Sequence, residues 1–599
     1  MTAREDWLSR IRATMARGEY LLAYDEATTA TAEHPDDLLL EHQTVLALAR
    51  TGATDRALEV LESSGLESKA ADVSAGLQED IAALRARLAK DRALTASGTE
   101  RQSRAREAAE HYEATYRRLG RPYSCVNAAT MWLVAGDSAR ATQLAHAARE
   151  LGRGSAAPET PTDAYWAAAT EAEVALLLDD PAEAEKALAR AAVEGTDDLA
   201  AVSVTRKQLL LICGLKGLDA DVLAPLAVPG VIHYGGHMIA PVGQPGRFPA
   251  EAEGAVLASI RDQLERLEVG FGYGSLACGA DILFAEGLLQ RGAEVHVMLP
   301  FDTDEFVRIS VSRAGEAWVR RFNECLQRAT TVTHATSGAY LDDASLFDYC
   351  ARLAMGHALI RSAFLAAPVA QVVVWDGAPG GGEAGTARDV DTWRAGRRRT
   401  HVIPVDGSEA VANRDGAPSS SSGRVLRAML FADVKGFSAL PDSLTVTFVR
   451  SVMGPLAETL DRFDAHILHR NSWGDGLYVV LDDVTAAAHC ALALQDTMKG
   501  LDLAETGLPP TLGLRIGAHM GPVFERLDPV RREPNFYGVE VTRTARIEPR
   551  TPEGDVYVTD PFAAMVALEA EGSLSCQYVG HIPTAKDYGT FPMYVLKDR

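Results

Sequence analysis

The run Phe431-Ala-Asp-Val-Lys-Gly-Phe-Ser438 has the pattern of a short apolar strand that carries a carboxylate, Asp433, to a glycine turn. Further along, His466-Ile-Leu-His-Arg-Asn-Ser-Trp-Gly-Asp-Gly-Leu-Tyr-Val-Val-Leu481 predicts two β-rich arms around a tight turn with Asp475 at its tip. If these strands are neighbours, the two carboxylates converge beside a glycine that lets backbone amides approach phosphate. Such a pair is suited to hold Mg²⁺ on a nucleoside triphosphate.

The segments around these two motifs predict an α+β domain. Their order is a strand at 425–434, a helix at 444–463, the hairpin at 466–481, a helix at 485–499 and a strand at 511–519. This order is the β-α-β-β-α-β pattern of a ferredoxin-like sheet, with additions.

Two further blocks follow the carboxylate motifs. They read Leu514-Arg-Ile-Gly-Ala-His-Met-Gly-Pro-Val523 and Tyr537-Gly-Val-Glu-Val-Thr-Arg-Thr-Ala-Arg-Ile547. With these blocks, the last third of the chain resembles the class III adenylate/guanylate cyclases. Four ordered blocks are far more specific than one, because an Asp in a strand-turn is usually a surface turn residue. The resemblance implies a catalytic domain at residues 425–599 and a homodimer whose active sites form between the protomers.

The resemblance also implies the roles of residues around the carboxylates. Asp433, Asp475 and the Val434 carbonyl would bind two Mg²⁺ (or Mn²⁺) ions per site. One ion lowers the pKa of the ribose 3′-hydroxyl, and the other neutralises the triphosphate. The products would be a 3′,5′-cyclic nucleotide and pyrophosphate. The backbone amides that would hold phosphate are those of Lys435, Gly436 and Phe437.

Three more positions carry over from the partner chain of the implied dimer. Arg546 would face the α-phosphate, where a rigid guanidinium stabilises developing charge. Lys586, within Thr-Ala-Lys-Asp-Tyr, stands where the family's phosphate-binding lysine is expected. The ribose-positioning residue is usually Asn, but this chain has Thr542, whose hydroxyl has a shorter reach. This departure can reduce turnover.

The positions that read the base in this family fall at Asn471 and Asn535. Two asparagines supply donors and acceptors without charge, so the pair matches neither purine code. ATP is the default substrate by family frequency. The alternative is a pyrimidine triphosphate, UTP or CTP, as in cyclases that resemble those of bacterial anti-phage signalling.

Two other classes of function stay open. In one, the cyclase-like domain is a receptor that only binds nucleotide or dimerises. The retained Asp433, Asp475 and Arg546 argue against it, whereas the missing Asn favours it. In the other, the middle of the chain carries the chemistry as a nucleotide-cleaving effector, with Asp281 and Glu383 as its candidate acids.

Residues 228–406 predict a Rossmann-like α/β domain with a mostly parallel, doubly wound sheet, because short apolar strands alternate with helical stretches. Glycines sit where strands meet helices and can present amides to phosphate. The run Gly380-Gly-Gly-Glu-Ala-Gly-Thr386 resembles the glycine-rich site of the SLOG superfamily, which implies a nucleotide-derived ligand. The candidate ligand residues are Gly235, Gly236, Gly274, Ser275, Gly381, Gly382, Gly385 and Thr386.

Residues 1–217 are rich in alanine and leucine at helical spacing. Segments such as 16–24 and 134–141 share one plan, in which a helix ends at Gly or Asp and an Ala-rich helix follows. This plan resembles degenerate tetratricopeptide-like repeats, which leave a concave surface for a protein partner. A structural spacer is an equally good interpretation. Between residues 407 and 424, Gly, Pro and four consecutive serines predict a flexible linker.

The whole chain, with 599 residues, predicts several domains. A formal charge of -23 argues against general binding to nucleic acid or anionic membrane. The charged N-terminal residues and the lack of a long apolar run predict neither a signal peptide nor a membrane anchor, and hence a cytoplasmic protein. The seven scattered cysteines predict buried free thiols. We interpret the chain as a signalling protein whose upstream domains alter the geometry of a cyclase dimer.

Overall fold

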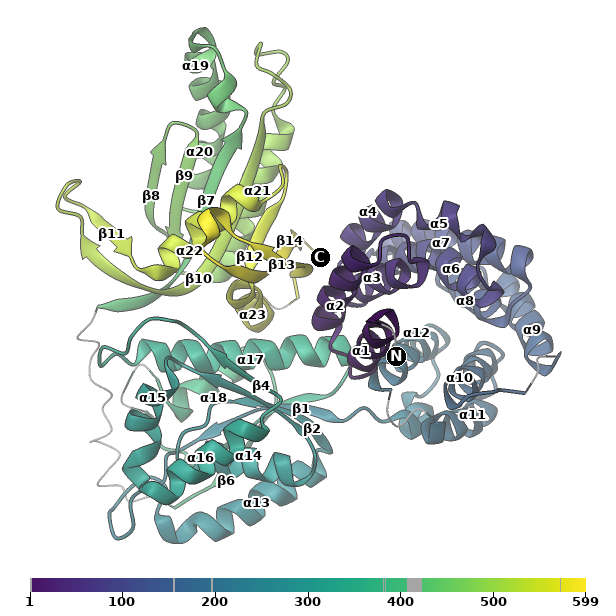
Figure 1. The fold of residues 1–599 in the computed structure, drawn as a ribbon, viewed down its shortest axis with the longest axis horizontal. Coiled ribbons are helices and arrows are strands. Elements are labelled where there is room, and N and C mark those ends of the chain that lie inside the picture. Colours follow the sequence, from purple (N-terminus) through teal and green to yellow (C-terminus); the bar gives the residue numbers. More distant parts are fainter. Residues whose placement is uncertain are drawn as a thin grey trace. The chain divides into compact units, whose positions relative to one another are not determined.

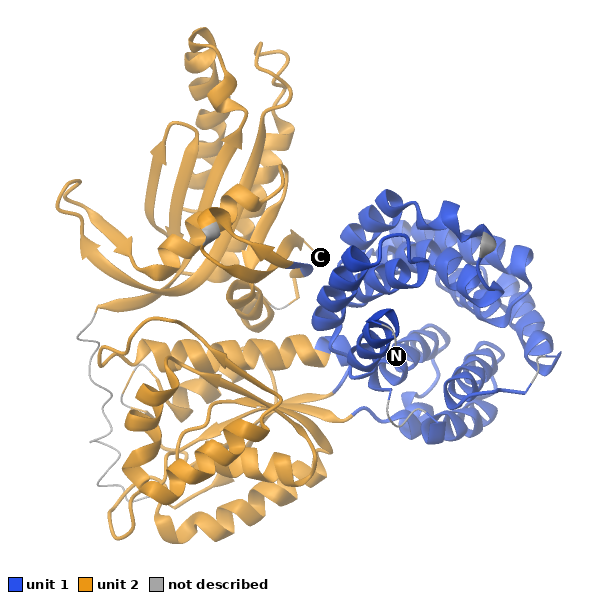
Figure 2. Cartoon of the chain, viewed as in Figure 1, with its two compact units in different colours: residues 1–228, 363–367, 577–580 blue, residues 229–362, 368–576, 581–599 orange. Residues whose placement is uncertain are grey.

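The computed structural model describes residues 3–154, 157–194, 198–380, 382, 384–406, 423–570 and 572–598. The chain forms two compact units (Figure 2). The first contains residues 1–228, 363–367 and 577–580, and the second contains residues 229–362, 368–576 and 581–599. The predicted linker falls outside the described residues from 407 to 422.

The first unit is helical, as predicted (Figure 1). Consecutive helices pack through small side chains, because alanines such as Ala23, Ala27 and Ala108 are fully buried. Polar residues define where the helices begin; for example, the Asp37 carboxylate accepts hydrogen bonds from the Leu39 and Leu40 amides. The helices are α1 (Ala3–Ala16), α2 (Tyr20–Glu33), α3 (Leu38–Arg50), α4 (Thr54–Ser64), α5 (Leu66–Lys69), α6 (Ala75–Thr95), α7 (Gly98–Leu119), α8 (Pro122–Val134), α9 (Ser138–Gly154), α10 (Pro161–Leu177), α11 (Pro181–Glu194) and α12 (Leu199–Lys216).

The second unit begins with a parallel six-stranded sheet, as the alternation of strands and helices predicts. Its order is β4-β3-β2-β1-β5-β6, so the direction of winding reverses at β1, between β2 and β5. The strands are β1 (Gly230–Gly236), β2 (Val269–Gly274), β3 (Glu294–Leu299), β4 (Thr331–His334), β5 (Val369–Trp375) and β6 (Thr400–Pro404). The helices are α13 (Glu253–Arg266), α14 (Ala280–Gln290), α15 (Thr303–Phe306), α16 (Glu316–Arg328), α17 (Ser345–Leu365) and α18 (Thr386–Ala395).

The rest of this unit is an α+β domain around an eight-stranded sheet with the order β13-β14-β12-β10-β7-β9-β8, and with β11 on β10. The helix predicted at 444–463 is two helices joined by a π-helical turn at Val449–Met453. The strands are β7 (Arg424–Lys435), β8 (Ile467–Trp473), β9 (Gly476–Leu481), β10 (Gly513–Leu527), β11 (Pro534–Tyr537), β12 (Val556–Thr559), β13 (Leu574–Pro583) and β14 (Thr590–Asp598). The helices are α19 (Asp442–Phe448), α20 (Gly454–Asp461), α21 (Val484–Gly500), α22 (Val539–Ile547) and α23 (Asp560–Glu569).

The two domains of the second unit pack against each other along α17. A Cβ atom at Gly356 of α17 would lie 2.2 Å from the carbonyl oxygen of Ala564 in α23, so this approach of two backbones requires glycine. The buried Tyr349 hydroxyl donates to the Met520 carbonyl of β10 at 2.9 Å. The contact is therefore close-packed, like a protein interior.

Ion pairs add to this packing. Arg424, at the start of β7, lies 3.0 Å from Asp343, and both side chains are buried. His357 of α17 lies 3.1 Å from Asp560 at the start of α23. Loss of one partner from a buried pair is costly, because the other charge stays buried without compensation. The buried Arg424–Asp343 pair therefore helps to specify how the two domains meet, and the half-buried His357–Asp560 pair adds to it.

Two sequence-wide expectations concern cysteines and membranes. Within the described residues all seven cysteines are free, and all but Cys576 are buried, which confirms the prediction of buried thiols. None of the helices in the described part of the chain combines the length and the apolar character that crossing a membrane requires.

The His357–Asp560 pair predicts a pH-dependent stability. Burial lowers the pKa of His357, but the charge and hydrogen bond of Asp560 raise it further, so this pKa lies above its ordinary value. The stabilisation is then complete below about pH 6.5 and is lost as the pH rises through the raised pKa. We expect the melting temperature of the wild type to fall more steeply between about pH 6 and pH 9 than that of His357→Gln.

The control for this experiment is His466→Gln. His466 pairs with Asp482 at 3.0 Å, but both side chains are exposed, and an exposed pair contributes little to stability. Parallel curves for the wild type and His357→Gln would contradict the prediction.

Candidate active site

Strand pairing brings the two predicted carboxylates together. In the β7–β9 ladder Ala432 lies opposite Leu477, so Asp433 lies beside the turn that joins β8 to β9. Gly474 in this turn has φ +72°, which glycine adopts without strain. Burial, together with the charge and hydrogen bond of Asp433, raises the pKa of Asp475. The two carboxylates therefore repel each other, and a cation between them would relieve that repulsion.

Two residues that the sequence analysis missed complete this group. Arg515 lies opposite Asp433 in the β7–β10 register, and its Nη2 atom is 2.7 Å from Oδ2 of Asp433. The Nε atom of Arg515 lies 2.5 Å from Oε1 of Glu548. Burial raises the pKa of Glu548 to about 7, and the charges of Asp433 and Asp475 add to this effect. The pairing register of β7 and β10 places Arg515 beside Asp433, but this register cannot be read from the sequence alone.

The donor set fits a magnesium ion that keeps several ligands from water or phosphate. Within the described residues no group of three or more His, Cys, Asp or Glu side chains is placed to hold a metal. Mg²⁺ in nucleotide sites needs only one or two carboxylates besides phosphate oxygens and water. Asp433, Asp475 and the main-chain carbonyl of Val434 supply oxygen donors of this kind.

The predicted phosphate-binding turn lies beside the same hairpin. Gly436 has φ +94° and begins a 3₁₀ turn at Phe437–Ala439. A Cβ atom at Gly474 would lie 3.7 Å from the Phe437 ring, so the two turns are in contact. The Lys435 amine forms an ion pair with Glu553. The Lys435 side chain is thus paired with Glu553, and the turn at residues 435–437 adjoins the hairpin through the Phe437 ring.

The other predicted catalytic residues lie on and beside α22. Thr542 is exposed and Arg546 is half-buried, and their four-residue spacing places them on one face of the helix. Lys586 is exposed in the turn Ala585–Asp587 and has φ +60°. The nearby Tyr588 hydroxyl donates to the carbonyl of Val539 at 3.4 Å, so this turn lies close to the start of α22.

The two candidate base-reading residues lie on neighbouring segments. His469 of β8 donates from Nδ1 to the Pro534 carbonyl of β11 at 3.1 Å, which brings Asn471 and Asn535 to the same region. The Asn535 amide donates to Asp528 at 3.0 Å. Its side-chain oxygen accepts from the Phe536 amide at 2.8 Å. Asn535 is therefore held within the β10–β11 hairpin.

A buried charge network connects α22 to the middle domain. Glu540 of α22 is fully buried, and its carboxylate lies 2.9 Å from both His519 Nε2 and Arg543 Nη1. Thr336, from the loop after β4, donates to the other oxygen of Glu540 at 2.8 Å. Burial raises the pKa of Glu540, but His519 and Arg543 lower it further, so the net shift is downward. The middle domain thus contacts the helix that carries Thr542 and Arg546.

The glycines predicted to bind a ligand in the middle domain differ in their surroundings. A Cβ atom at Gly236 would lie 2.6 Å from the Val374 carbonyl oxygen, and one at Gly274 would lie 2.6 Å from the Tyr234 carbonyl oxygen. Packing between strands therefore accounts for both. Gly235 adjoins Asp281, whose pKa burial raises to about 7.

The end of β5 carries an ion pair that the sequence analysis missed. Asp376 accepts hydrogen bonds from Arg247 at 2.7 Å and 2.5 Å, and His237 lies 3.1 Å away. Thr386, at the start of α18, is within 3.4 Å of the His237 ring. The hydroxyl of Ser275 is buried and has no hydrogen-bond partner among the described residues. Polar side chains thus fill the crevice where the winding reverses.

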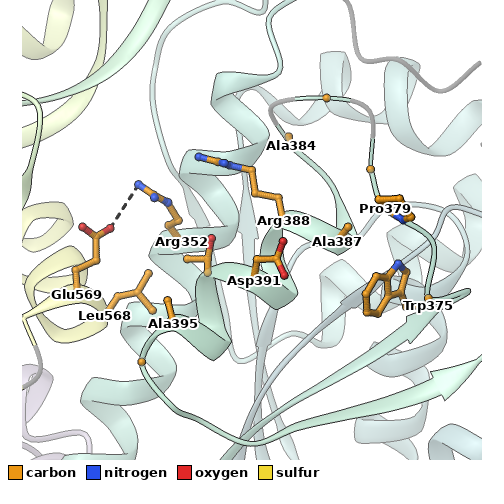
Figure 3. A pocket seen from close by; sticks show the side chains of 15 residues that line it. Arg352, Trp375, Pro379, Ala384, Ala387, Arg388, Asp391, Ala395, Leu568 and Glu569 are labelled. Atoms are coloured by element: carbon orange, nitrogen blue, oxygen red, sulfur yellow. Dashed lines mark ion pairs between the residues drawn. The ribbon is translucent and has the colours of Figure 1, made fainter. Parts of the chain in front are cut away.

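A pocket of about 660 Å³ lies beside the glycine-rich loop, and Gly382 lines it (Figure 3). Gly385 precedes α18 with φ +122°, whereas Gly381 and Glu383 lie outside the described residues. Arg352 of α17 and Glu569 of α23 approach to 3.4 Å in its wall. The volume is typical of small-molecule sites, and the wall includes residues of both domains.

Two parts of the chain match known protein families. Residues 421–598 match the family model of the adenylate and guanylate cyclase catalytic domain, and residues 19–132 match the model Tetratricopeptide Repeats-Sensor. No curated protein matches the chain. The C-terminal domain is therefore a class III cyclase catalytic domain by homology, and the helical region is a tetratricopeptide-type domain.

Several solved structures are similar to the chain. The adenylyl cyclase CyaB from P. aeruginosa is 19% identical, with a TM-score of 0.27, over 29% of this chain and 95% of that one. The guanylate cyclase domain of RhGC from Catenaria anguillulae in complex with GTP is 18% identical, with a TM-score of 0.25, over 29% of this chain and 96% of that one. An adenylate cyclase from Trypanosoma brucei in its monomeric state is 22% identical, with a TM-score of 0.26, over 31% of this chain and 93% of that one.

Because Glu540 is buried among charged and polar partners, we expect its replacement by Gln to lower the stability of the fold strongly. Burial lowers the pKa of His519, so Arg543 is the cation that Glu540 compensates. Glu540→Gln keeps an acceptor for Thr336 but removes the charge that compensates Arg543. We expect a loss of about 3 kcal/mol in the free energy of unfolding. For a domain of this size, that loss corresponds to a fall of roughly 6–12 °C in melting temperature, measurable by calorimetry.

The exposed Glu505 provides the control, because Glu505→Gln removes the same charge from the surface of the same domain. Surface substitutions of this kind stay within about 0.5 kcal/mol of the wild type. Equal melting temperatures for the two variants would show that the buried network does not stabilise the fold.

Proposed function

We propose that the chain is a signalling nucleotidyl cyclase, which converts a nucleoside triphosphate, ATP by default, to a 3′,5′-cyclic nucleotide and pyrophosphate. The observation that carries the proposal is the convergence of Asp433 and Asp475 beside the turn at Gly436, within a domain homologous to cyclases. A protein that only binds nucleotide has no physical need for two carboxylates that repel each other.

In this proposal the chain's own residues perform distinct steps. Asp433, Asp475 and the Val434 carbonyl would hold two Mg²⁺ or Mn²⁺ ions, which activate the ribose 3′-hydroxyl and neutralise the triphosphate. Amides of residues 435–437 bind phosphate oxygens. Arg546 and Lys586 stabilise charge on the phosphates, and Thr542 orients the ribose. Arg515 balances the charge of Asp433.

The position of Arg546 supports a homodimer with shared active sites. Glu548 approaches Arg515 and hence the carboxylates, whereas Arg546 lies two residues earlier, about 200° around the helix axis. Within one chain Arg546 therefore points away from Asp433, and a second chain is needed to unite them. Exposed apolar residues in the same domain could supply a surface for that chain: Val446, Val449, Leu468 and Trp473.

The choice of nucleotide rests on Asn471 and Asn535. Their neutral amides suit a base that presents both donors and acceptors, so a pyrimidine triphosphate is the second candidate substrate. The hydrogen bonds that hold Asn535 fix the orientation of its amide and leave one N–H for a base. Product identification separates the candidates.

The middle domain is proposed to sense a nucleotide-derived ligand, because the pocket in Figure 3 is bounded by the glycine-rich loop and by Glu569 of the cyclase domain. The Thr336–Glu540 contact offers a route from that domain to α22. A ligand that favours one arrangement of α22 would shift the population of productive dimers. We keep the division into residues 1–217, 228–406, 407–424 and 425–599, with a protein partner for the helical repeats and a cytoplasmic location.

The first test of the proposal is turnover. We expect the purified full chain, with Mg²⁺ or Mn²⁺, to form a cyclic nucleotide and pyrophosphate from at least one of ATP, GTP, CTP and UTP. Asp433→Ala and Asp475→Ala should reduce the rate to background, and Arg546→Ala should reduce it by about 10²–10³-fold. Mass spectrometry identifies the product.

The exposed Asp442 lies nine residues after Asp433, and Asp442→Ala should leave the rate unchanged. If none of the four triphosphates is converted, the enzyme proposal fails and the receptor remains. If turnover survives Asp433→Ala, the chemistry lies elsewhere in the chain.

A mixing experiment tests the shared site. Asp433→Ala and Arg546→Ala are each inactive as homodimers, but a mixed dimer keeps one intact site. Random exchange of protomers should then restore roughly a quarter of the wild-type rate. Absence of recovery, with exchange verified by a tagged protomer, would place all catalytic residues within one chain.

A further inference from the structure

Four cationic side chains meet in the helical unit, which the proposed cyclase function does not use. Arg50 ends α3, Arg87 and Lys90 lie on α6, and Lys207 lies on α12. The Lys207 amine already donates to the carbonyls of Ala363 and Phe364, at 3.0 Å and 2.9 Å, so it contributes charge rather than an unpartnered donor. Lys90 donates to Gln208, the residue after Lys207, at 2.9 Å, so α6 and α12 are in contact here. We call these four residues the inner cationic cluster.

The charges of the inner cationic cluster influence one another. Burial, together with the charges of Arg87 and Arg50, lowers the pKa of Lys207 to about 8, although Asp91 opposes this effect. Burial and the charge of Arg87 also lower the pKa of Lys90. Like charges in a partly desolvated region repel one another. Asp91, 3.8 Å from Arg87 Nε, offsets this repulsion in part and raises the pKa of Arg87 despite burial.

The most informative feature of this region is a set of buried donors without partners. Within the described residues, the Nε atoms of Arg50 and Arg87 are buried and make no hydrogen bond. The hydroxyls of Tyr20 and Tyr112 are likewise buried and without a hydrogen-bond partner among the described residues. The two residues as a whole are 2% and 0% exposed. The Arg50 guanidinium lies 5.8 Å from the centre of the Tyr20 ring. All four groups can donate, so the missing partner is an acceptor.

Nearby carboxylates do not satisfy these donors. Asp91 is 3.8 Å from Arg87 Nε, beyond hydrogen-bond distance. Glu173 accepts hydrogen bonds from Gln208 and Thr130, both at 2.7 Å. Asp198 caps α12 through the Ala201 amide at 2.8 Å. The carboxylates of Glu173 and Asp198 are thus bound to other partners. Although the chain has a formal charge of -23, the acidic residues that the structure describes leave these donors without hydrogen bonds.

From these contacts we infer that the helical unit binds a small phosphorylated molecule at the inner cationic cluster, with the Tyr20 and Tyr112 hydroxyls as further donors. A phosphate group carries up to two charges and three strong acceptor oxygens, which match the unpartnered donors. The Arg87 side chain is only 18% exposed, so access suits a compact anion better than a peptide chain. The Tyr123 ring, 6.5 Å from that of Tyr112, offers an aromatic face to an organic portion of the ligand.

The test is a binding measurement on the full chain in EDTA, with inorganic phosphate, pyrophosphate and AMP as probes in titration calorimetry. Pyrophosphate or AMP should bind the wild type, and less tightly as salt increases. Arg87→Gln and Arg50→Gln should each lose about 10–100-fold in affinity. Arg85→Gln is the matched control, since Arg85 lies on the same helix but pairs with Glu67 at 2.7 Å; its affinity should equal that of the wild type.

A second measurement separates a ligand site from a structural role. Without ligand, Arg50→Gln should melt at the same temperature as the wild type or higher, because burial and the charge of Arg87 disfavour the charge of Arg50, whereas Asp91 stabilises that of Arg87. A structural arginine would instead lower the melting temperature when replaced. If Arg87→Gln fails to fold, as judged by circular dichroism, Arg50→Gln and Lys207→Gln decide the outcome.

Three results would overturn the inference. They are no binding of any probe to the wild type, equal binding to the wild type and to the cluster variants, or tighter binding of polyglutamate than of pyrophosphate. The last result would assign the cluster to an acidic protein partner. Because the probes are used without divalent metal and Arg85→Gln keeps an intact cyclase domain, failure here is distinct from failure of the cyclase proposal.

Discussion

The register of β7 against β10 is the constraint on which the second unit depends. This ladder runs from Lys435 opposite Gly513 to Arg424 opposite Phe524. At one end it sets Asp433 across from Arg515, and at the other it places Arg424 against Asp343 of the middle domain. A shift by one residue would turn every side chain of β7 to the opposite face. One strand thus fixes both the candidate active site and the contact between domains.

Local patterns predicted most of the fold. Alternating strands and helices gave the parallel sheet, and the helical spacing of alanines gave the first unit. The carboxylates could be predicted because each follows or precedes a β-rich run at a glycine turn. The π-helical turn between α19 and α20 was missed, because it lies inside an uninterrupted helical run and only shifts the apolar pattern locally.

The remaining parts of the site depend on contacts between distant residues. Arg515, Glu548 and Thr336 acquire their roles from partners 82, 33 and 204 positions away, and a single sequence contains no signal for such pairs. Glycines show a second limit of sequence patterns. Gly236 and Gly274 fit a phosphate-binding pattern, but the same lack of a side chain lets neighbouring strands pack closely. Sequence patterns do not distinguish these two uses of glycine.

The contact of Gly356 with Ala564 limits the motions available to the second unit. Two helices that contact each other through side chains can slide along each other by small amounts, because the side chains change rotamer. Where the two backbones are in direct contact, there is no side chain to adjust. The close approach of Gly356 to Ala564 therefore disfavours sliding of α17 along α23. A change in the middle domain could then reach the catalytic domain only through local shifts of side chains and helices at their contact, such as that of Thr336 with Glu540 in α22.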